Sequence, residues 1–222
     1  MFDLDTIINL ISKFLALMLV LPLHEFAHGF AAVKCGDPTP KLYRRYTINP
    51  LAHFDYVGLI CFAITGFGWA KPVPVNPHNF KNYKKGCFFV SIAGVTANYL
   101  LAFLVFPLII LAQFVPNFGY FDDVLYLALY YTFTFSLSFF VFNLIPVYPL
   151  DGFRVVDALT KKRNKFYWFL RNQGIYVLYF LFLLSIVSDL TGVYQIDILS
   201  LILSKIVNLI SKPIYLFWGL FF

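Results

Sequence analysis

The chain has 222 residues, of which 60% are hydrophobic and 13% are charged, and its formal net charge is +6. A soluble domain of this length cannot bury that much apolar surface in one core, so the composition excludes an ordinary soluble protein. A positive charge would suit a nucleic-acid partner, but in a membrane chain clustered Lys and Arg mark topology, so we expect no nucleic-acid partner. The three cysteines lie far apart without a CxxC pair, which argues against both a disulfide framework and a cysteine metal site.

Several apolar stretches are long enough to cross a hydrocarbon layer of about 30 Å, which takes about 20 helical residues. We expect transmembrane helices over residues 7–33, 86–114, 124–142 and 175–187. The first stretch is too long for a cleavable signal peptide and lacks its basic start, so we expect it to be retained. Residues 196–222 are apolar but carry two lysines and a proline, a pattern that allows either a further span or a helix at the membrane interface. The predicted fold is an all-α polytopic membrane protein, a bundle of about four to six transmembrane helices.

Prolines interrupt this pattern at two places. The apolar stretch 56–80 contains, in its second half, Pro72, Pro74 and Pro77. These prolines exclude a regular helix there, and the Val-Pro-Val-Pro alternation predicts a β-hairpin-like segment. We expect it to be re-entrant, because non-helical backbone survives at membrane depth only where protein or water satisfies its polar groups. The second interruption follows the span 124–142, where Pro146 and Pro149 predict a broken helix.

The basic residues predict the orientation. Lys and Arg gather in loops 34–56 and 157–171, whereas loop 115–123 contains neither. By the positive-inside rule, the basic loops lie in the cytoplasm and the N-terminus lies outside. The expected location is the cell membrane, where the chain crosses the lipid bilayer several times and His24 and His28 lie toward the cytoplasmic side.

The segment LHEFAHGF, residues 23–30, places ionisable side chains inside the first apolar stretch. On a helix, His24 and His28 share one face, about one turn apart, which suits two imidazole ligands on one Zn²⁺. Glu25, the only glutamate of the chain, is placed to reach a metal-bound water rather than the metal. The alternative is a pair of histidines that form interhelical hydrogen bonds, but ionisable groups in lipid are costly and usually functional.

A catalytic zinc needs a third protein ligand and one open position. His53, His78 and Asp55 lie in or beside loops, and we expect the two histidines to be structural. Asp151 is the favoured ligand, because it follows the expected helix break and Gly152 behind it permits tight backbone geometry. The alternative for Asp151 is an N-cap of the helix that starts at Gly152.

Two motifs together, HEFAHGF at residues 24–30 and NLIPVYPLDG at residues 143–152, resemble the site-2 protease family of intramembrane zinc metalloproteases. That family pairs H-E-x-x-H with a later N-x-x-P-x-x-x-L-D-G. Further segments are similar to segments of the same family: GDPTPKLYRRYTINPLAHFDYVG, GWAKPVPVNP and AGVTAN. The resemblance covers residues 21–157. It implies a single domain over 1–222 in a compact form without PDZ or CBS domains, with a catalytic core at 7–157 and C-terminal helices at 166–222.

The resemblance also implies roles for individual residues. The ligands of one zinc ion per chain are His24, His28 and Asp151, and the catalytic base is Glu25. The family keeps two further polar residues near the site, Asn98 and Asn143. Such amides can donate to the oxyanion of a tetrahedral intermediate, where loss of one donor costs about 3–4 kcal/mol. They can instead form interhelical hydrogen bonds worth about 1 kcal/mol. Both readings stay open for Asn98, and the catalytic one is favoured for Asn143.

The implied function is regulated intramembrane proteolysis, in which zinc-bound water, assisted by Glu25, attacks a peptide bond within or next to the transmembrane segment of a membrane protein substrate. A substrate helix must first unwind, and residues 68–75 are expected to offer an edge for the unwound strand. Two alternatives stay open: a metal-ion transporter that uses the same ligands, and an inactive relative that only binds membrane partners.

Overall fold

The computed structural model describes residues 3–65, 68–114 and 119–222. Within these residues, five helices are long and apolar enough to cross a membrane: α1 (Leu4–Cys35), α5 (Tyr83–Ala112), α6 (Tyr120–Asn143), α9 (Gly174–Thr191) and α10 (Ile198–Trp218). The shorter helices are α2 (Thr39–Leu42), α3 (Pro50–His53), α4 (Tyr56–Thr65), α7 (Asp151–Leu159) and α8 (Lys165–Asn172), with 3₁₀ turns η1 (Pro77–Asn79) and η2 (Tyr194–Ile196). The chain is a multi-pass membrane protein, and all four expected spans are helices.

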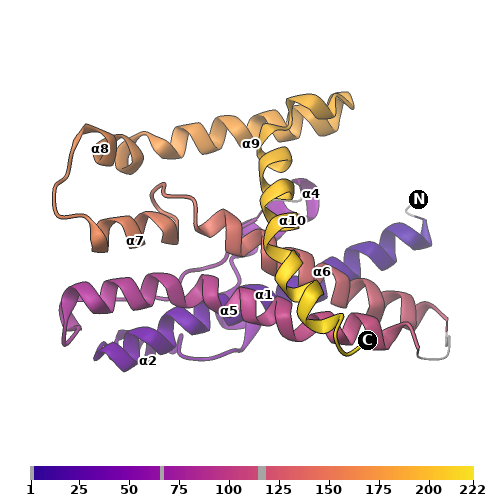
Figure 1. The fold of residues 1–222 in the computed structure, drawn as a ribbon, viewed down its shortest axis with the longest axis horizontal. Coiled ribbons are helices and arrows are strands. Elements are labelled where there is room, and N and C mark those ends of the chain that lie inside the picture. The colour runs from indigo at the N-terminus through magenta and orange to yellow at the C-terminus, as the bar shows by residue number, and fades with distance from the viewer. Residues whose placement is uncertain (1–2, 66–67, 115–118) are drawn as a thin grey trace.

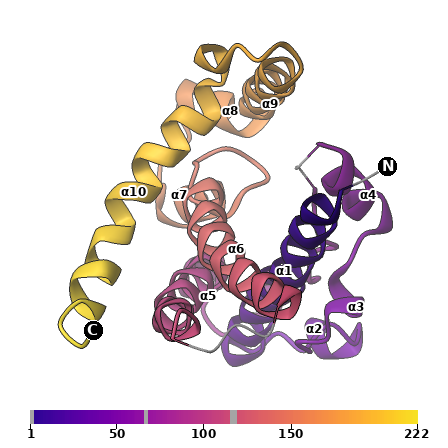
Figure 2. The ribbon, with the colours of Figure 1, turned by 90° about the vertical axis from the view of Figure 1, so that its right-hand side faces the viewer.

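Helices α1, α5 and α6 form the centre of the molecule and lie side by side in both views (Figures 1 and 2). One buried cluster joins α5 to α6 through Ala102, Val105, Phe133 and Leu137, and Ile214 of α10 packs against it. Side chains as small as Ala102 let helices approach closely, which favours helix association in lipid. Within this three-helix centre, α1 carries His24, Glu25 and His28.

Helix α10 lies across the bundle rather than along it. Figure 1 shows α10 crossing α5 and α6 at a steep angle, while α9 runs along their direction. Two side chains fasten α10 to α5: the Tyr99 hydroxyl donates to the Ile210 carbonyl at 3.2 Å, and the Trp218 indole N–H donates to the Phe103 carbonyl at 2.9 Å. The tail is therefore long and apolar enough for a span, yet it is oriented differently from the other long helices.

The first helix has well-defined ends. Asp3 caps its N-terminus by accepting from the Thr6 N–H, and Gly36 ends it in the left-handed conformation with φ +109°. Glycine tolerates this conformation because it has no Cβ. Pro22 lies inside the helix, just before the metal-binding motif, and neighbouring helices make such a proline tolerable in a membrane. The helix therefore runs unbroken past His24 and His28.

The expected helix break near the site is present between α6 and α7. Residues 144–150 separate the two helices, and this connection contains Pro146 and Pro149. The chain then turns so tightly that a Cβ on Gly152 would lie 2.2 Å from the Leu144 carbonyl oxygen. Only glycine allows this approach. The break and Gly152 together bring Asp151, the first residue of α7, back toward α1.

The β-hairpin-like segment expected in the second half of the apolar stretch 56–80 is not confirmed. The proline-free first half of the stretch forms helix α4, and its second half is extended, with one isolated antiparallel bridge between Phe54 and Ala70. Residues 66 and 67 lie outside the described residues. The apolar residues 56–65 contain no proline, so nothing prevents their helix, whereas Pro72 and Pro74 exclude one further on. Close contact holds the two halves together, since a Cβ on Gly58 would lie 2.2 Å from the Trp69 carbonyl oxygen.

Candidate metal centre and active site

The structure brings His24, His28 and Asp151 together, although the last two are 123 positions apart in the sequence. The two imidazole Nε2 atoms lie 3.0 Å apart, and the Asp151 Oδ2 atom lies 3.3 Å from one and 3.0 Å from the other. All three residues are buried. In the described part of the chain, this is the one cluster of three or more such side chains that is close enough to hold a metal ion.

The spacing of these atoms fits a zinc ion. Ligand atoms at about 2.0–2.1 Å from a tetrahedral zinc lie about 3.3 Å from one another, close to the separations just given. The buried Asp151 Oδ2 has no hydrogen-bond partner, and a buried carboxylate oxygen without one is costly unless a cation neutralises it. Two imidazoles and one carboxylate also match the donor set of catalytic zinc sites, which leave one position open. The residues present therefore fit the metal.

The orientation of His28 supports the same conclusion. Its Nδ1 atom lies 2.7 Å from the Val90 carbonyl oxygen on α5. A carbonyl only accepts, so Nδ1 carries the proton and Nε2 of the neutral ring presents its lone pair toward Asp151 and His24. Hydrogen bonding of a ligand's second nitrogen to a backbone carbonyl is a common feature of histidines that bind metal.

Gly94 of α5 provides the space for the imidazoles. A Cβ at this position would lie 2.4 Å from the His28 Nε2 atom and 2.8 Å from the His24 Nε2 atom. Both are the nitrogens that face Asp151, so the bare α5 backbone forms one wall of the metal site. No larger residue fits here without displacing the ligands.

Asn98 lies on α5 one helical turn beyond Gly94 and contacts a ligand. Its side chain is fully buried, and its amide lies 3.2 Å from the His24 Nδ1 atom. With the nitrogen in that position, the amide oxygen has no partner. Turning the amide over lets Oδ1 accept from the Nδ1–H of His24, which leaves the His24 Nε2 lone pair for the metal, and such assignments follow from the hydrogen-bond network. The structure thus places Asn98 behind a metal ligand.

Glu25 lies beside the metal ligands, and its Oε2 accepts a hydrogen bond from the Val73 backbone N–H at 2.8 Å. Val73 is buried and belongs to the extended segment that follows α4. The donor fixes one carboxylate oxygen and leaves the other available. This contact was not foreseen from the sequence, because backbone donors leave no residue signature.

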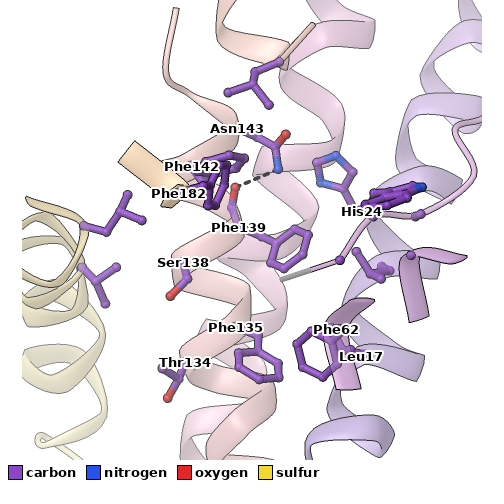
Figure 3. Close-up of a pocket in the computed structure, with 18 of the residues that line it drawn as sticks. Leu17, His24, Phe62, Thr134, Phe135, Ser138, Phe139, Phe142, Asn143 and Phe182 are labelled. Atoms are coloured by element: carbon purple, nitrogen blue, oxygen red, sulfur yellow. Dashed lines mark hydrogen bonds between the residues drawn. The ribbon is translucent and has the colours of Figure 1, made fainter. Parts of the chain in front are cut away.

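A groove is lined by His24 and Glu25. Its volume is about 630 Å³. Its walls are mainly apolar and come from α1, α4, α6, α9, α10 and residues 68–70. Figure 3 shows His24 and Asn143 at one end, with Phe62, Phe135 and Thr134 farther along. The groove is therefore an apolar space with polar, metal-binding chemistry at one end.

Asn143 is the last residue of α6 and lines this groove. Its amide nitrogen donates to the Phe139 carbonyl at 3.1 Å within its own helix. The oxyanion role remains a prediction, because no contact between Asn143 and the metal ligands is present.

The two remaining histidines lie outside the metal cluster. His53 is fully buried, and its Nε2 lies 2.7 Å from the Thr47 carbonyl oxygen. His78 is exposed in the turn η1, where its ring lies 6.3 Å from the ring of Tyr83. Asp55 accepts from the backbone N–H groups of Val57 and Gly58 at the start of α4. None of the three belongs to the cluster of His24, His28 and Asp151, and the structural roles expected for His53 and His78 stay predictions.

The sequence reasoning did not single out Asp37, which is fully buried just after α1. Burial alone would raise its pKa, but hydrogen bonds from Thr39, Asn79 and Asn76 hold the pKa of this carboxyl below its usual range. The signal available was the Asp-Pro-Thr spacing, which is typical of a side chain that caps its own turn.

Comparisons with known proteins agree with this site. The model of peptidase family M50 matches residues 121–187, which include Asn143 and Asp151. A protein of Bacillus subtilis (strain 168), described as "Putative zinc metalloprotease YwhC", is 39% identical over 148 residues, which cover 66% of this chain and 68% of that protein. No solved structure matches the chain.

An H-E-x-x-H helix, a distant aspartate and a bundle of apolar helices together define a membrane protein with a metalloprotease site. The chain belongs to peptidase family M50, the site-2 protease family.

Proposed function

We propose that this protein is an intramembrane zinc protease that hydrolyses a peptide bond within or next to the transmembrane segment of a membrane protein. Its one zinc ion is held by His24, His28 and Asp151. The observation that carries the proposal is the apolar groove of about 630 Å³ that ends at His24 and Glu25. A groove with such walls suits an apolar segment better than a hydrated peptide.

The chain's own residues supply the proton transfers. When zinc is bound, it polarises the scissile carbonyl and lowers the pKa of a coordinated water toward about 7. Glu25 takes a proton from the attacking water and returns it to the leaving amine. Asn143 donates to the oxyanion from the opposite wall of the groove.

The extended segment supplies an edge for the substrate. Peptide bonds in a helix are hydrogen-bonded to one another, so the substrate must unwind before hydrolysis. Of the segment 68–75, residues Gly68, Trp69 and Ala70 line the groove. An unwound strand pairs there by β-augmentation.

The orientation follows the positive charges. With the basic loops in the cytoplasm, α1 enters from outside and its metal ligands lie in the cytoplasmic half of the bilayer. The partners of the protein are then the lipid bilayer and a membrane protein with a transmembrane helix.

Two variants test the function. Glu25→Gln removes the base but keeps the zinc ligands, whereas His24→Ala removes a ligand. Each is co-expressed with tagged single-span membrane proteins, and zinc content and cleavage are measured together. We expect Glu25→Gln to keep zinc and lose cleavage, and His24→Ala to lose both.

Full cleavage by Glu25→Gln would refute the proposal. Zinc transport into vesicles that survives in Glu25→Gln would favour the metal-ion transporter, since a transporter needs ligand exchange but no base. Bound zinc with no cleavage by the unmodified protein would favour the inactive relative.

A further inference from the structure

The extended segment after α4 donates one particular N–H to the proposed base. Between Lys71 and Val75 the residues alternate with prolines, which have no N–H. The Lys71 N–H donates to the His53 carbonyl at 2.7 Å, and the Val73 N–H donates to Glu25 at 2.8 Å. The two backbone N–H groups of residues 71–74 therefore both form hydrogen bonds within the protein. The residues before the two prolines are also restricted to extended conformations, so the Val73 N–H has little freedom to turn away.

Asp37 fastens this segment three residues beyond Val73. Its Oδ2 atom accepts from the Asn76 N–H at 2.7 Å, and its Oδ1 atom accepts from the Asn79 side chain at 2.7 Å and from the Thr39 N–H at 3.0 Å. The Thr39 hydroxyl donates to the same Oδ1. Every partner is a donor, so an ionised carboxylate is the one side chain of this size that satisfies all of them.

Segment 71–76 is thus held by hydrogen bonds at both of its ends, to His53 at Lys71 and to Asp37 at Asn76. At one end His53, itself buried and bonded to Thr47, holds Lys71. At the other end Asp37 follows directly on α1, the helix that carries Glu25. Val73 lies between the two ties, and its side chain packs against α1, since a Cβ on Gly29 would lie 3.4 Å from its Cγ1.

We propose that Asp37 is a positioning residue for the reaction: it holds segment 71–76 so that the Val73 N–H fixes the carboxylate of Glu25 beside the metal ligands. This inference rests on the proposed function, in which Glu25 is the base. The geometry of a general base determines its effect, and a misplacement of about 1 Å costs about 100-fold in rate. Asp37 thereby acts on catalysis without touching substrate or metal.

Substitutions of Val73 test the backbone donor directly. Val73→Pro removes the N–H from a segment that already alternates with prolines, whereas Val73→Ala keeps the N–H and removes the packing. Val75→Pro removes an N–H that has no hydrogen-bond partner among the described residues. The probe is a single-span protein that the unmodified enzyme cleaves in the test above. We expect kcat of Val73→Pro to fall at least tenfold below that of both other variants, with zinc content and KM equal among the three.

Hydrogen exchange tests the Asp37 tie without any substrate. In Asp37→Asn, an NH₂ group replaces one of the two carboxylate oxygens that accept from Asn76, Asn79 and Thr39. Because an NH₂ group only donates, at least one of these hydrogen bonds is lost. We expect the Val73 and Asn76 amides to exchange at least tenfold faster than in the unmodified protein, while amides of α5 and α6 keep their rates. In Glu25→Ala, the Val73 amide is expected to exchange faster as well.

The outcomes separate the two proposals. Equal kcat in Val73→Pro and Val73→Ala, or unchanged Val73 exchange in Asp37→Asn, would overturn the positioning role. Faster exchange throughout α1, α5 and α6 would overturn it too, because Asp37 would then support the whole fold. If the unmodified protein cleaves nothing, the proposed function fails, and the exchange rates still decide whether Asp37 holds the Val73 N–H on Glu25.

Discussion

Replacing Gly94 by alanine adds one methyl group at the wall of the metal site. Its carbon would lie 2.4 Å from the His28 Nε2 atom, and an ordinary contact is 3.4 Å or more, so the imidazole must move by roughly 1 Å. The ring has little room to move, because its other nitrogen is bonded to the Val90 carbonyl at 2.7 Å. Metal–ligand distances tolerate only about 0.2 Å, so a displacement of this size removes His28 from the coordination sphere.

Loss of a hydrogen bond that supports a metal ligand lowers metal affinity about 10–100-fold. We expect Gly94→Ala to reduce zinc affinity by more than this, because it displaces the ligand itself. Zinc per protein is measured after equilibration with a chelator of known affinity. The matched control is Gly29→Ala on the ligand helix itself, where the added Cβ meets its nearest neighbour, Val73, at 3.4 Å. We expect the control to hold zinc as the unmodified protein does. Normal zinc affinity in a folded Gly94→Ala protein would refute the assignment of these Nε2 atoms as ligands.

Three further predictions follow from the same geometry. Asn98→Leu is expected to lower zinc affinity about 10–100-fold, whereas Asn98→Asp, which still accepts from His24, keeps it. Normal affinity of Asn98→Leu in a chelator competition would contradict a role of Asn98 in supporting His24. Gly58→Ala places a Cβ 2.2 Å from the Trp69 carbonyl oxygen, so it should displace residues 68–70. We expect kcat/KM to fall about 100-fold while zinc is retained. Cleavage at the normal rate would contradict the proposed role of residues 68–70 as an edge for the substrate. Because its pKa is lowered in the folded protein, Asp37 stabilises the local tie of segment 71–76 above its unfolded pKa of about 3.9, and this contribution is lost as the pH falls through the lower folded value. The difference in protection factor at the Asn76 amide between Asp37→Asn and the unmodified protein should therefore be largest near pH 7 and shrink on acidification, and a difference independent of pH would exclude the carboxylate as its source.

Single residues near the site show why some expectations succeeded. His24 and His28 are one helical turn apart, so their common face follows from helix geometry alone. Asp151 was found because prolines and a glycine leave a signature of a break in the chain. In the stretch 56–80, Pro72 and Pro74 correctly excluded a helix from the second half, but the β-hairpin-like pairing expected there is not confirmed.

Other features depend on the approach of distant segments. The steep crossing of α10 over α5 and α6 (Figure 1) depends on side chains such as Tyr99 and Trp218 meeting carbonyls on another helix. The role of Gly94 as the wall behind two imidazoles, and of Val73 as a donor to Glu25, likewise has no local pattern. A backbone N–H donor, or the space left by a glycine, cannot be recognised as part of a site from the sequence, because its role depends on which segment packs against it.

The sequence by itself determined that this is a helical membrane protein with an H-E-x-x-H metal motif, because hydropathy and helical spacing are local properties of the chain. Only the tertiary structure showed that Asp151 lies beside the two histidines and that Asn98 and Val73 contact His24 and Glu25. Those contacts join segments far apart in the sequence, and their geometry arises only when α1, α5 and the extended segment pack against one another.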